Sequence, residues 1–277
     1  DVAGLEAAIQ GGADRIELCS ALSVGGLTPS AGLMSAAQRS RIPCYAMIRP
    51  RAGDFIYSPA ELDIMTNDIY FAASAGLAGV VFGASLPDGR LDSEALITLC
   101  NAVGTMPRTL HRAFDLVPDM TEAIELAVEC GFERILTSGR AASAAEGLDD
   151  IAEALRIANG RISIMPGSGV NLDTIDHILG RLAVKEVHSS CSSTSRTGSL
   201  WRSAFRKPRS GRPMPTPCAR SKSSSPVVTD EKRPFSGANR HGEYRIHRCL
   251  PGRGGRGERS MSQEAGGNAG KLLPAHT

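Results

Sequence analysis

Ionisable and nucleophilic side chains recur where short apolar runs of the sequence end. The stretch "RTLHRAFD" (108–115) begins as a buried strand would and then carries His111, Arg112 and Asp115, where a chain that needed only a core would place aliphatic residues. Other apolar runs end in the same way, with Glu17, Cys19, Arg49, Arg51, Asp54, Thr137, Ser138, Glu186, His188 and Ser189. Imidazole, carboxylate, guanidinium and thiol groups can carry proton transfer, anion binding and metal binding.

Acid–base chemistry on a small anionic or phosphorylated substrate is one interpretation of these residues. Histidine titrates near neutral pH, so His111 or Glu17 could act as a general base, with His188 as the acid or the orienting partner. Arg49 and Arg51 would hold the anion. The alternative is a satisfied structural network, in which Glu17 clamps Arg49 and His111 is simply hydrogen-bonded.

Further candidates for ligand binding lie beside these groups. Gly167 and Gly169 in the turn "PGSG" (166–169) would let backbone amides approach a phosphate, with Ser168 and the amides near Ser189 completing the cradle, although a plain tight turn is the alternative. The remaining candidates are Asp54, Arg112, Asp115, Thr137 and Ser138.

Cys19 is the candidate metal ligand. A thiolate at this position could join His111 and His188 in a site for Cu(I) or Zn(II), but no local ligand spacing supports such a site. The chain has 7 cysteines, an odd number, scattered without a CxxC pair. This usage argues against a disulfide framework and predicts a cytoplasmic protein.

Two kinds of segment, predicted strands and predicted helices, alternate along the sequence and must position these residues. Short apolar runs after Gly or Pro predict strands at 15–19, 42–50, 78–85, 107–115, 133–139, 161–169 and 185–190. Amphipathic stretches of helical period lie before each strand, and the clearest begins with Ser58 as N-cap and Pro59 at the first helical position. Such alternation predicts a parallel sheet with helical crossovers.

Seven strands point to an α/β protein with a (β/α)8 TIM barrel. Asp1 already begins a helix, so we expect a first strand to be missing before it. The runner-up is an open doubly wound sheet, but no GxGxxG follows the first predicted strand. In a barrel, active sites lie at the C-terminal ends of the strands. Because side chains alternate along a strand, Glu17, Cys19, His111, Glu186 and His188 should all point inward there.

Composition excludes some classes of function and distinguishes two parts of the chain. The net charge is +2 over 277 residues, and no apolar run approaches the roughly 18–20 residues of a transmembrane helix, so neither nucleic acid nor a membrane is an expected partner. Residues 191–277 carry 17 Lys+Arg against 5 Asp+Glu, whereas residues 1–190 carry 14 against 24. The tail is also rich in Ser, Gly, Pro and Arg. It is predicted to be disordered or to come from an altered reading frame.

Seven motifs resemble one family in order and at fitting distances. They are "GADRIELC", "GGLTPS", "IRPRAGDFIYS", "LHRAFD", "ILTSG", "GSGV" and "EVHSS", and together they closely resemble the CutC family, named for copper homeostasis. The resemblance covers about residues 1–190 and implies a TIM barrel, a cytoplasmic location, a homodimer and copper as the ligand.

The sequence also departs from this family at both ends. The resemblance implies a first strand with a Glu and a Cys upstream of Asp1, and a last helix after "EVHSS"; neither is recognisable here. Of the usual cysteines Cys19 remains, which leaves both a copper protein and an enzyme acting on a small anion as functional hypotheses. A third expectation is that such an incomplete barrel is poorly soluble.

Overall fold

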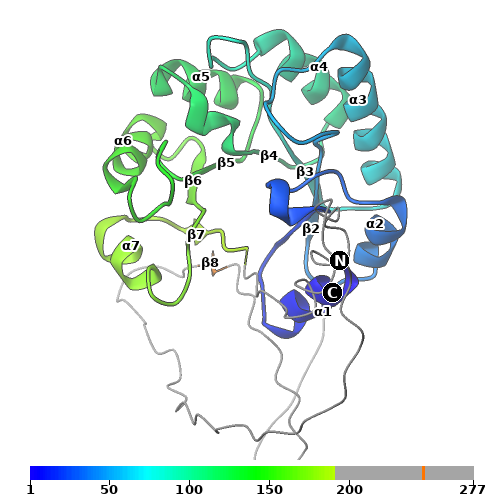
Figure 1. Ribbon diagram of the computed structural model, residues 1–277, viewed down its shortest axis with the longest axis horizontal. Helices are drawn as coiled ribbons and strands as arrows, with labels where there is room; N and C mark the ends of the chain where they lie inside the picture. The colour runs from blue at the N-terminus through cyan, green and yellow to red at the C-terminus, as the bar shows by residue number, and fades with distance from the viewer. Residues whose placement is uncertain (191–244, 247–277) are drawn as a thin grey trace, which may run out of the picture.

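The computed structural model describes residues 1–190 and the backbone of residues 245–246. Seven helices alternate with seven strands along this chain, as the sequence predicts (Figure 1). The helices are α1 (Val2–Gln10), α2 (Ala31–Gln38), α3 (Pro59–Ser74), α4 (Ser93–Val103), α5 (Met120–Glu129), α6 (Leu148–Ala158) and α7 (Ile175–Arg181). The strands are β1 (Ile16–Leu18), β2 (Cys44–Met47), β3 (Gly79–Phe82), β4 (Arg108–Leu110), β5 (Arg134–Thr137), β6 (Ser163–Pro166) and β7 (Glu186–Val187).

All of these strands run parallel in sequence order. Strands β1 to β6 form one hydrogen-bonded sheet, and the amide of His188 extends it by donating to the carbonyl of Pro166 at 2.8 Å. On its other side β7 pairs in parallel with β8 (Arg245–Ile246), a short strand within the tail. Apart from these two residues, the predicted disordered or frame-shifted tail lies outside the described residues.

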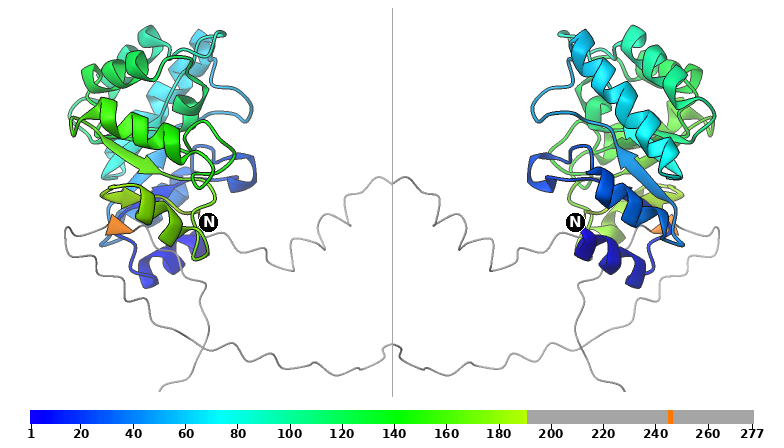
Figure 2. Two further views of the ribbon diagram at one scale, coloured as in Figure 1. Left: turned by 90° about the vertical axis from the view of Figure 1, so that its left-hand side faces the viewer. Right: turned by 90° about the vertical axis from the view of Figure 1, so that its right-hand side faces the viewer.

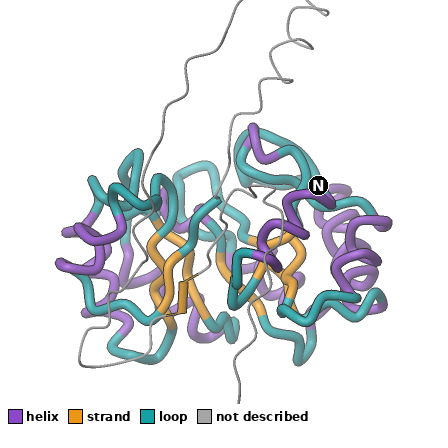
Figure 3. The backbone as a smooth tube through the Cα atoms, turned by 90° about the horizontal axis from the view of Figure 1, so that it is seen from below, coloured by secondary structure: helices purple, strands orange, loops and turns teal. Residues whose placement is uncertain are grey.

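The helices form a layer outside the curved sheet, which confirms the predicted α/β TIM-barrel fold. Figures 2 and 3 show the helices along the outer side of the strands, seen from two sides and from below. The local sequence explains the helix starts: Ser58 and Glu61 form a reciprocal capping box at the start of α3, next to a proline in its first turn. Within the described residues, no helix is both long and apolar enough to cross a bilayer.

Alternation along each strand divides the apolar residues into two groups. Ile16, Leu18 and Ala46 belong to the main core between the strands and the helices. A second, separate cluster consists of Tyr45, Met47 and Val81, with Cys19 and Ala78 packed against it. The two clusters lie on opposite faces of the same strands, because successive side chains of a strand point to opposite sides. The second cluster therefore marks the interior of the barrel.

Two polar contacts inside the barrel join β1 to the far end of the sheet. Arg15 donates to Glu186 at 2.8 Å, and the Nε2 of His188 lies 3.3 Å from a carboxylate oxygen of Glu17. Within the described residues β1 is hydrogen-bonded to one strand, β2. Side chains rather than backbone pairing therefore connect β1 with β7.

The strand predicted at 107–115 ends earlier than expected. Strand β4 stops at Leu110, and a short 3₁₀ helix, η2 (Arg112–Leu116), follows. The His111 side chain explains this change, because its Nδ1 accepts a hydrogen bond from the amide of Ala113 at 3.1 Å and so caps η2. A second 3₁₀ helix, η1 (Leu22–Val24), lies in the loop after β1.

Candidate active site

Glu17 and His188 meet inside the mouth of the barrel, as the alternation predicts. Their side chains lie 3.3 Å apart, and that of Glu17 is 5% exposed whereas that of His188 is 24% exposed. The other carboxylate oxygen of Glu17 has no hydrogen-bond partner within residues 1–190. Gly167 makes room for this pair, since a Cβ on it would lie 3.3 Å from the Cβ of His188 and 2.4 Å from the Cδ1 of Leu136. The pair could bind a polar ligand or move a proton.

Arg49 organises two loops at the mouth. Its guanidinium donates to the carbonyls of Val24, Gly26 and Gly53 at 2.8, 3.1 and 2.7 Å, and it lies 5.0 Å from the ring centroid of Phe55. Arg49 does not form the ion pair with Glu17 that was one of the alternatives from the sequence. Its guanidinium binds the loop carbonyls instead. The Nε of Arg49 is buried and has no hydrogen-bond partner in the part of the chain that the structure describes. Arg49 therefore shapes the site and retains one N–H for a ligand.

His111 is a buried, neutral hydrogen-bond donor. Its Nδ1 accepts from the amide of Ala113, so its proton lies on Nε2. This Nε2 is buried, and none of the described residues accepts a hydrogen bond from it. Burial, together with the neighbouring positive charge of Arg49, lowers the pKa of His111 to about 3. Its ring packs 4.5 Å from that of Phe55. This arrangement favours donation to a ligand over the general-base role that the sequence suggested.

Two unpredicted residues add further unpartnered polar atoms at the same end of the barrel. The hydroxyls of Tyr57, in the loop after β2, and Ser85, after β3, are both buried, and neither has a hydrogen-bond partner among the residues described. Burial raises the pKa of Tyr57 to about 12, so this phenol stays protonated as a donor. Sequence analysis singled out neither: Tyr57 lies in a loop beyond the strand predicted at 42–50, and Ser85 was overlooked although it closes the strand predicted at 78–85.

A hydrogen-bonded network at the rim connects four of the predicted site residues: Asp115, Thr137, Ser138 and Arg112. Asp115 accepts from the hydroxyl of Thr137 at 2.5 Å, from the amide of Ser138 at 3.0 Å and from the Nε of Arg112 at 2.7 Å. Arg112 also donates to the hydroxyl of Ser138 at 2.8 Å. This network joins η2 to the end of β5 and holds the rim in place.

Arg51 and Asp54 also pair with each other. Arg51 lies 2.9 Å from Asp54, forms a second ion pair with Glu61, and donates to the carbonyl of Ile56 at 2.6 Å. The side chains of Arg51 and Asp54 are 36% and 60% exposed. These contacts fix the loop between β2 and α3, on which Phe55 and Tyr57 stand.

The turn after β6 is ordered by its own contacts. Ser168 and Gly169 have positive φ angles of 74° and 70°, and a Cβ on Gly169 would lie 2.9 Å from the Cβ of Ser143. Ser189 donates to the carbonyl of Val170 at 2.7 Å. A ligand-binding role for Gly167, Gly169 and Ser189 stays a prediction.

Glu186 does not join the mouth, contrary to the expectation that it closes the last strand. Its carboxylate binds Arg15, Arg134 and Ser163 at 2.8, 3.2 and 2.6 Å. These partners precede or open β1, β5 and β6, so Glu186 lies towards the opposite end of the barrel. It is the first residue of β7, and an inward direction alone does not fix its height along the barrel axis.

Cys19 lies at the mouth and packs against the cluster that contains Met47. A Cβ built on Gly26 would lie 3.2 Å from the Sγ of Cys19 and 3.8 Å from the Cε of Met47. Burial raises the pKa of the Cys19 thiol. In the part of the chain that the structure describes, no group of three or more His, Cys, Asp or Glu residues could hold a metal ion. The predicted site of Cys19 with both histidines is therefore not assembled.

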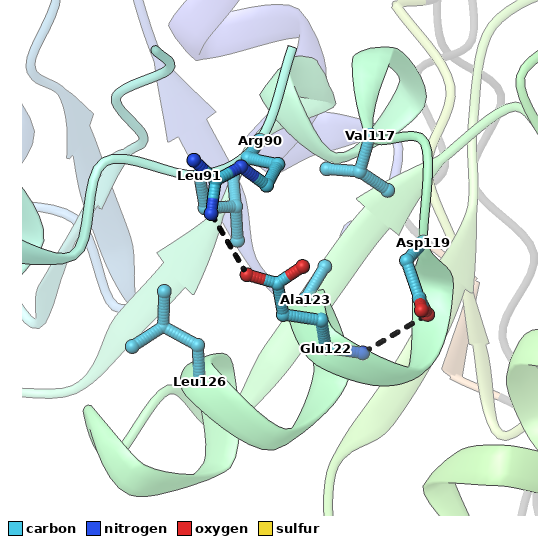
Figure 4. Close-up of a pocket in the computed structure, with 7 residues that line it drawn as sticks. All are labelled: Arg90, Leu91, Val117, Asp119, Glu122, Ala123 and Leu126. Atoms are coloured by element: carbon cyan, nitrogen blue, oxygen red, sulfur yellow. Dashed lines mark hydrogen bonds and ion pairs between the residues drawn. The ribbon is translucent and has the colours of Figure 1, made fainter. Parts of the chain in front are cut away.

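A small hollow on the outer flank of the barrel does not belong to this site. It lies between the loop after β3 and the start of α5, and its polar groups already have partners (Figure 4). Arg90 lies 3.7 Å from Glu122, and Asp119 accepts from the amide of Glu122 at 3.2 Å. The candidate site is the barrel mouth.

Comparison with known proteins identifies relatives over the barrel region. The family model described as CutC family matches residues 1–193. A CutC family protein of Rhizobium meliloti is 62% identical over 193 residues, which cover 70% of this chain and 79% of the relative. A human protein named copper homeostasis protein cutC homolog is 45% identical over 196 residues, covering 70% and 72%. The crystal structure of a CutC protein from Streptococcus agalactiae is similar with a TM-score of 0.62 at 36% identity, covering 64% of this chain and 88% of that one.

Proposed function

The chain belongs to the CutC family, and we propose that it serves copper homeostasis by holding a copper(I) ion at Cys19 in the mouth of the barrel. The observation that carries this proposal is the approach of the Cys19 thiol and the Met47 side chain to the same point beneath Gly26. Thiolate and thioether sulfur are the ligands that select copper(I). The name of the human relative supports copper as the ion concerned.

The thiol must lose its proton when copper binds. Burial raises the pKa of Cys19, so the thiol is protonated at neutral pH in the metal-free protein. Copper(I) then displaces one proton. As long as the pH is below that pKa, the apparent affinity for copper(I) should therefore increase about tenfold for each unit by which the pH is raised. Anaerobic titration against a chromophoric copper(I) chelator at several pH values measures this slope.

We predict that Cys19→Ser removes one equivalent of bound copper(I) from the protein. A serine hydroxyl is a hard, protonated ligand that copper(I) does not favour. Cys44→Ser is the matched control, because Cys44 is buried at the start of β2 and its thiol donates to the carbonyl of Ile42. An unchanged copper count and affinity in Cys19→Ser would refute the proposal.

The proposal also includes where the protein acts and whether it forms a dimer. The four described cysteines, Cys19, Cys44, Cys100 and Cys130, are free thiols, which supports a reducing cytoplasm. The homodimer expected from the family resemblance is part of the proposal too.

A second candidate function is catalysis on a small anionic ligand in the same mouth. Five buried polar atoms that have no hydrogen-bond partner among the described residues follow from β1 to β4 around this end of the barrel: Glu17 Oε1, Arg49 Nε, Tyr57 Oη, Ser85 Oγ and His111 Nε2. Unpartnered buried polar groups are costly, and a bound ligand would satisfy them. Three of these atoms are certain donors, which favours an anion.

We therefore expect inorganic phosphate or a small carboxylate such as malonate to raise the melting temperature. Binding at a ligand concentration 100 times the Kd would stabilise the fold by about 2.7 kcal/mol. Tyr57→Phe removes one hydroxyl that lacks a partner and should weaken the shift, whereas Tyr70→Phe, on the exposed side of α3, should not. If a folded wild-type chain shows no shift with any of these anions, this second function is ruled out.

A further inference from the structure

Two groups of polar side chains face each other across the mouth of the barrel. Strands β1 to β7 follow one another around the barrel in sequence order. The end of β4 therefore lies across from the place where β1 and β7 approach each other (Figure 1). His111 directly follows β4, whereas the pair of Glu17 and His188 stands where β1 and β7 meet. A ligand between the two groups would contact both.

The group on the β4 side supplies hydrogen-bond donors around Phe55. The guanidinium of Arg49 lies 5.0 Å and the ring of His111 4.5 Å from the centroid of the Phe55 ring. The amide of Ser85 donates to the carbonyl of Phe55 at 2.9 Å, and Tyr57 follows two residues later in the same loop. All four side chains around Phe55 have a buried polar atom that no described residue binds. These N–H and O–H groups suit an anionic group.

The charge of this group matches a carboxylate. Arg49 alone is cationic among its four polar side chains, because His111 is neutral and the other two carry hydroxyls. One guanidinium balances a single negative charge, whereas a phosphate monoester brings between one and two. A carboxylate can also accept from several donors at once.

Glu17 on the opposite side requires a hydrogen-bond donor. One oxygen of its carboxylate faces His188 at 3.3 Å, and the other, Oε1, is buried and meets no donor in the described part of the chain. A carboxylate oxygen accepts hydrogen bonds, and a buried acceptor that lacks one is costly. A simple anion would leave this atom unsatisfied. A ligand that also carries an O–H or N–H group would satisfy both sides of the mouth.

We propose that the mouth binds a small carboxylate that carries a hydroxyl or amino group, with the carboxylate at Arg49 and His111 and the second group donating to Glu17. This proposal rests on the second candidate function, anion binding in the mouth, and defines its class of ligand. It assigns Glu17 the task of distinguishing substituted from unsubstituted acids.

Two matched series of ligands test the proposal on the wild-type chain. Lactate, alanine and propionate share a three-carbon carboxylate and differ in one substituent, as do malate, aspartate and succinate with four carbons. In isothermal titration calorimetry, the hydroxy or amino acid of at least one series should bind about tenfold or more tightly than its unsubstituted counterpart. The stronger of the two substituted acids identifies the group that Glu17 recognises.

Three variants assign the recognition to its side of the mouth. Glu17→Gln should abolish the preference for the substituted acid without weakening the binding of propionate or succinate. Tyr57→Phe should weaken every member of a series alike, because this hydroxyl belongs to the group that binds the carboxylate. Glu133→Gln is the matched control: its side chain is 45% exposed and pairs with Arg134 at the start of β5, so all affinities should stay unchanged.

The outcomes separate this inference from the function on which it rests. If phosphate or malonate binds but no substituted acid binds more tightly than its counterpart, the anion site stands and this inference is overturned. A preference that survives in Glu17→Gln overturns it as well. If none of these anions binds to the folded wild-type chain, the second candidate function fails and this inference fails with it. The comparison of ligands uses the wild-type protein, so it decides the matter even if Glu17→Gln does not fold.

Discussion

Replacing Glu186 by glutamine is expected to lower the free energy of unfolding by about 3 kcal/mol. The substitution keeps the shape of the side chain but removes the negative charge that Arg15 and Arg134 share. All three side chains are buried, with exposures of 8%, 9% and 12%. Both guanidiniums also lie over the ring of Tyr45, at 5.4 and 5.3 Å from its centroid, so neither can move easily into solvent. Removing one member of a buried ion network leaves charge uncompensated, which is the costly case.

Glu133→Gln is the matched control for this prediction. Glu133 also pairs with Arg134, at 3.0 Å, but its side chain is 45% exposed. Exposed ion pairs contribute about 0–1 kcal/mol, so the control should change stability little. Urea unfolding followed by circular dichroism measures both variants. Equal destabilisation by the two substitutions would show that burial of the network is not what makes Glu186 important.

The strand pattern predicted which side chains enter the barrel but not how far along it they lie. Glu17 and His188 were expected inside and are 3.3 Å apart. Glu186 was also expected inside, yet it binds residues at the opposite end. Period-two alternation fixes the face of a strand, whereas height along the barrel depends on register between strands, and the sequence carries no local signal for register.

The partners of polar side chains were the least predictable feature. One alternative placed Arg49 in an ion pair with Glu17, but the terminal nitrogens of its guanidinium donate to the loop carbonyls of Val24, Gly26 and Gly53. Asp115 was expected to bind a ligand, and within the described residues it accepts hydrogen bonds from the chain itself. Loop conformation decides both outcomes, and loops lack the periodicity on which sequence analysis relies. Residue types at strand ends therefore located the mouth, while the roles within it required the structure.

Mild acid should destabilise the protein because His111 takes up a proton more readily in the unfolded state. This effect should begin at pH values where the carboxylates of the protein are still charged. The pKa of His111 is about 3 in the folded protein, whereas an unfolded histidine has a pKa of about 6.5. The unfolded state therefore binds a proton first as the pH falls. The stability that the neutral ring contributes is fully present above about pH 6.5 and is lost progressively towards pH 3. Between pH 7 and pH 5 the loss should be about 2 kcal/mol.

His111→Asn isolates this contribution. The amide oxygen can still accept from the Ala113 amide and cap η2, as Nδ1 does, but it has no proton to titrate in this range. The carboxyl of Glu186 does not interfere: burial alone would raise its pKa, but Arg15 and Arg134 hold it at about 2, so its effect on stability begins below about pH 4.5. Urea unfolding at pH 7, 6 and 5 should therefore show a steeper loss for wild type than for the variant. Parallel slopes would mean that His111 is protonated in the folded protein at these pH values, and the neutral donor assigned to the barrel mouth would then be wrong.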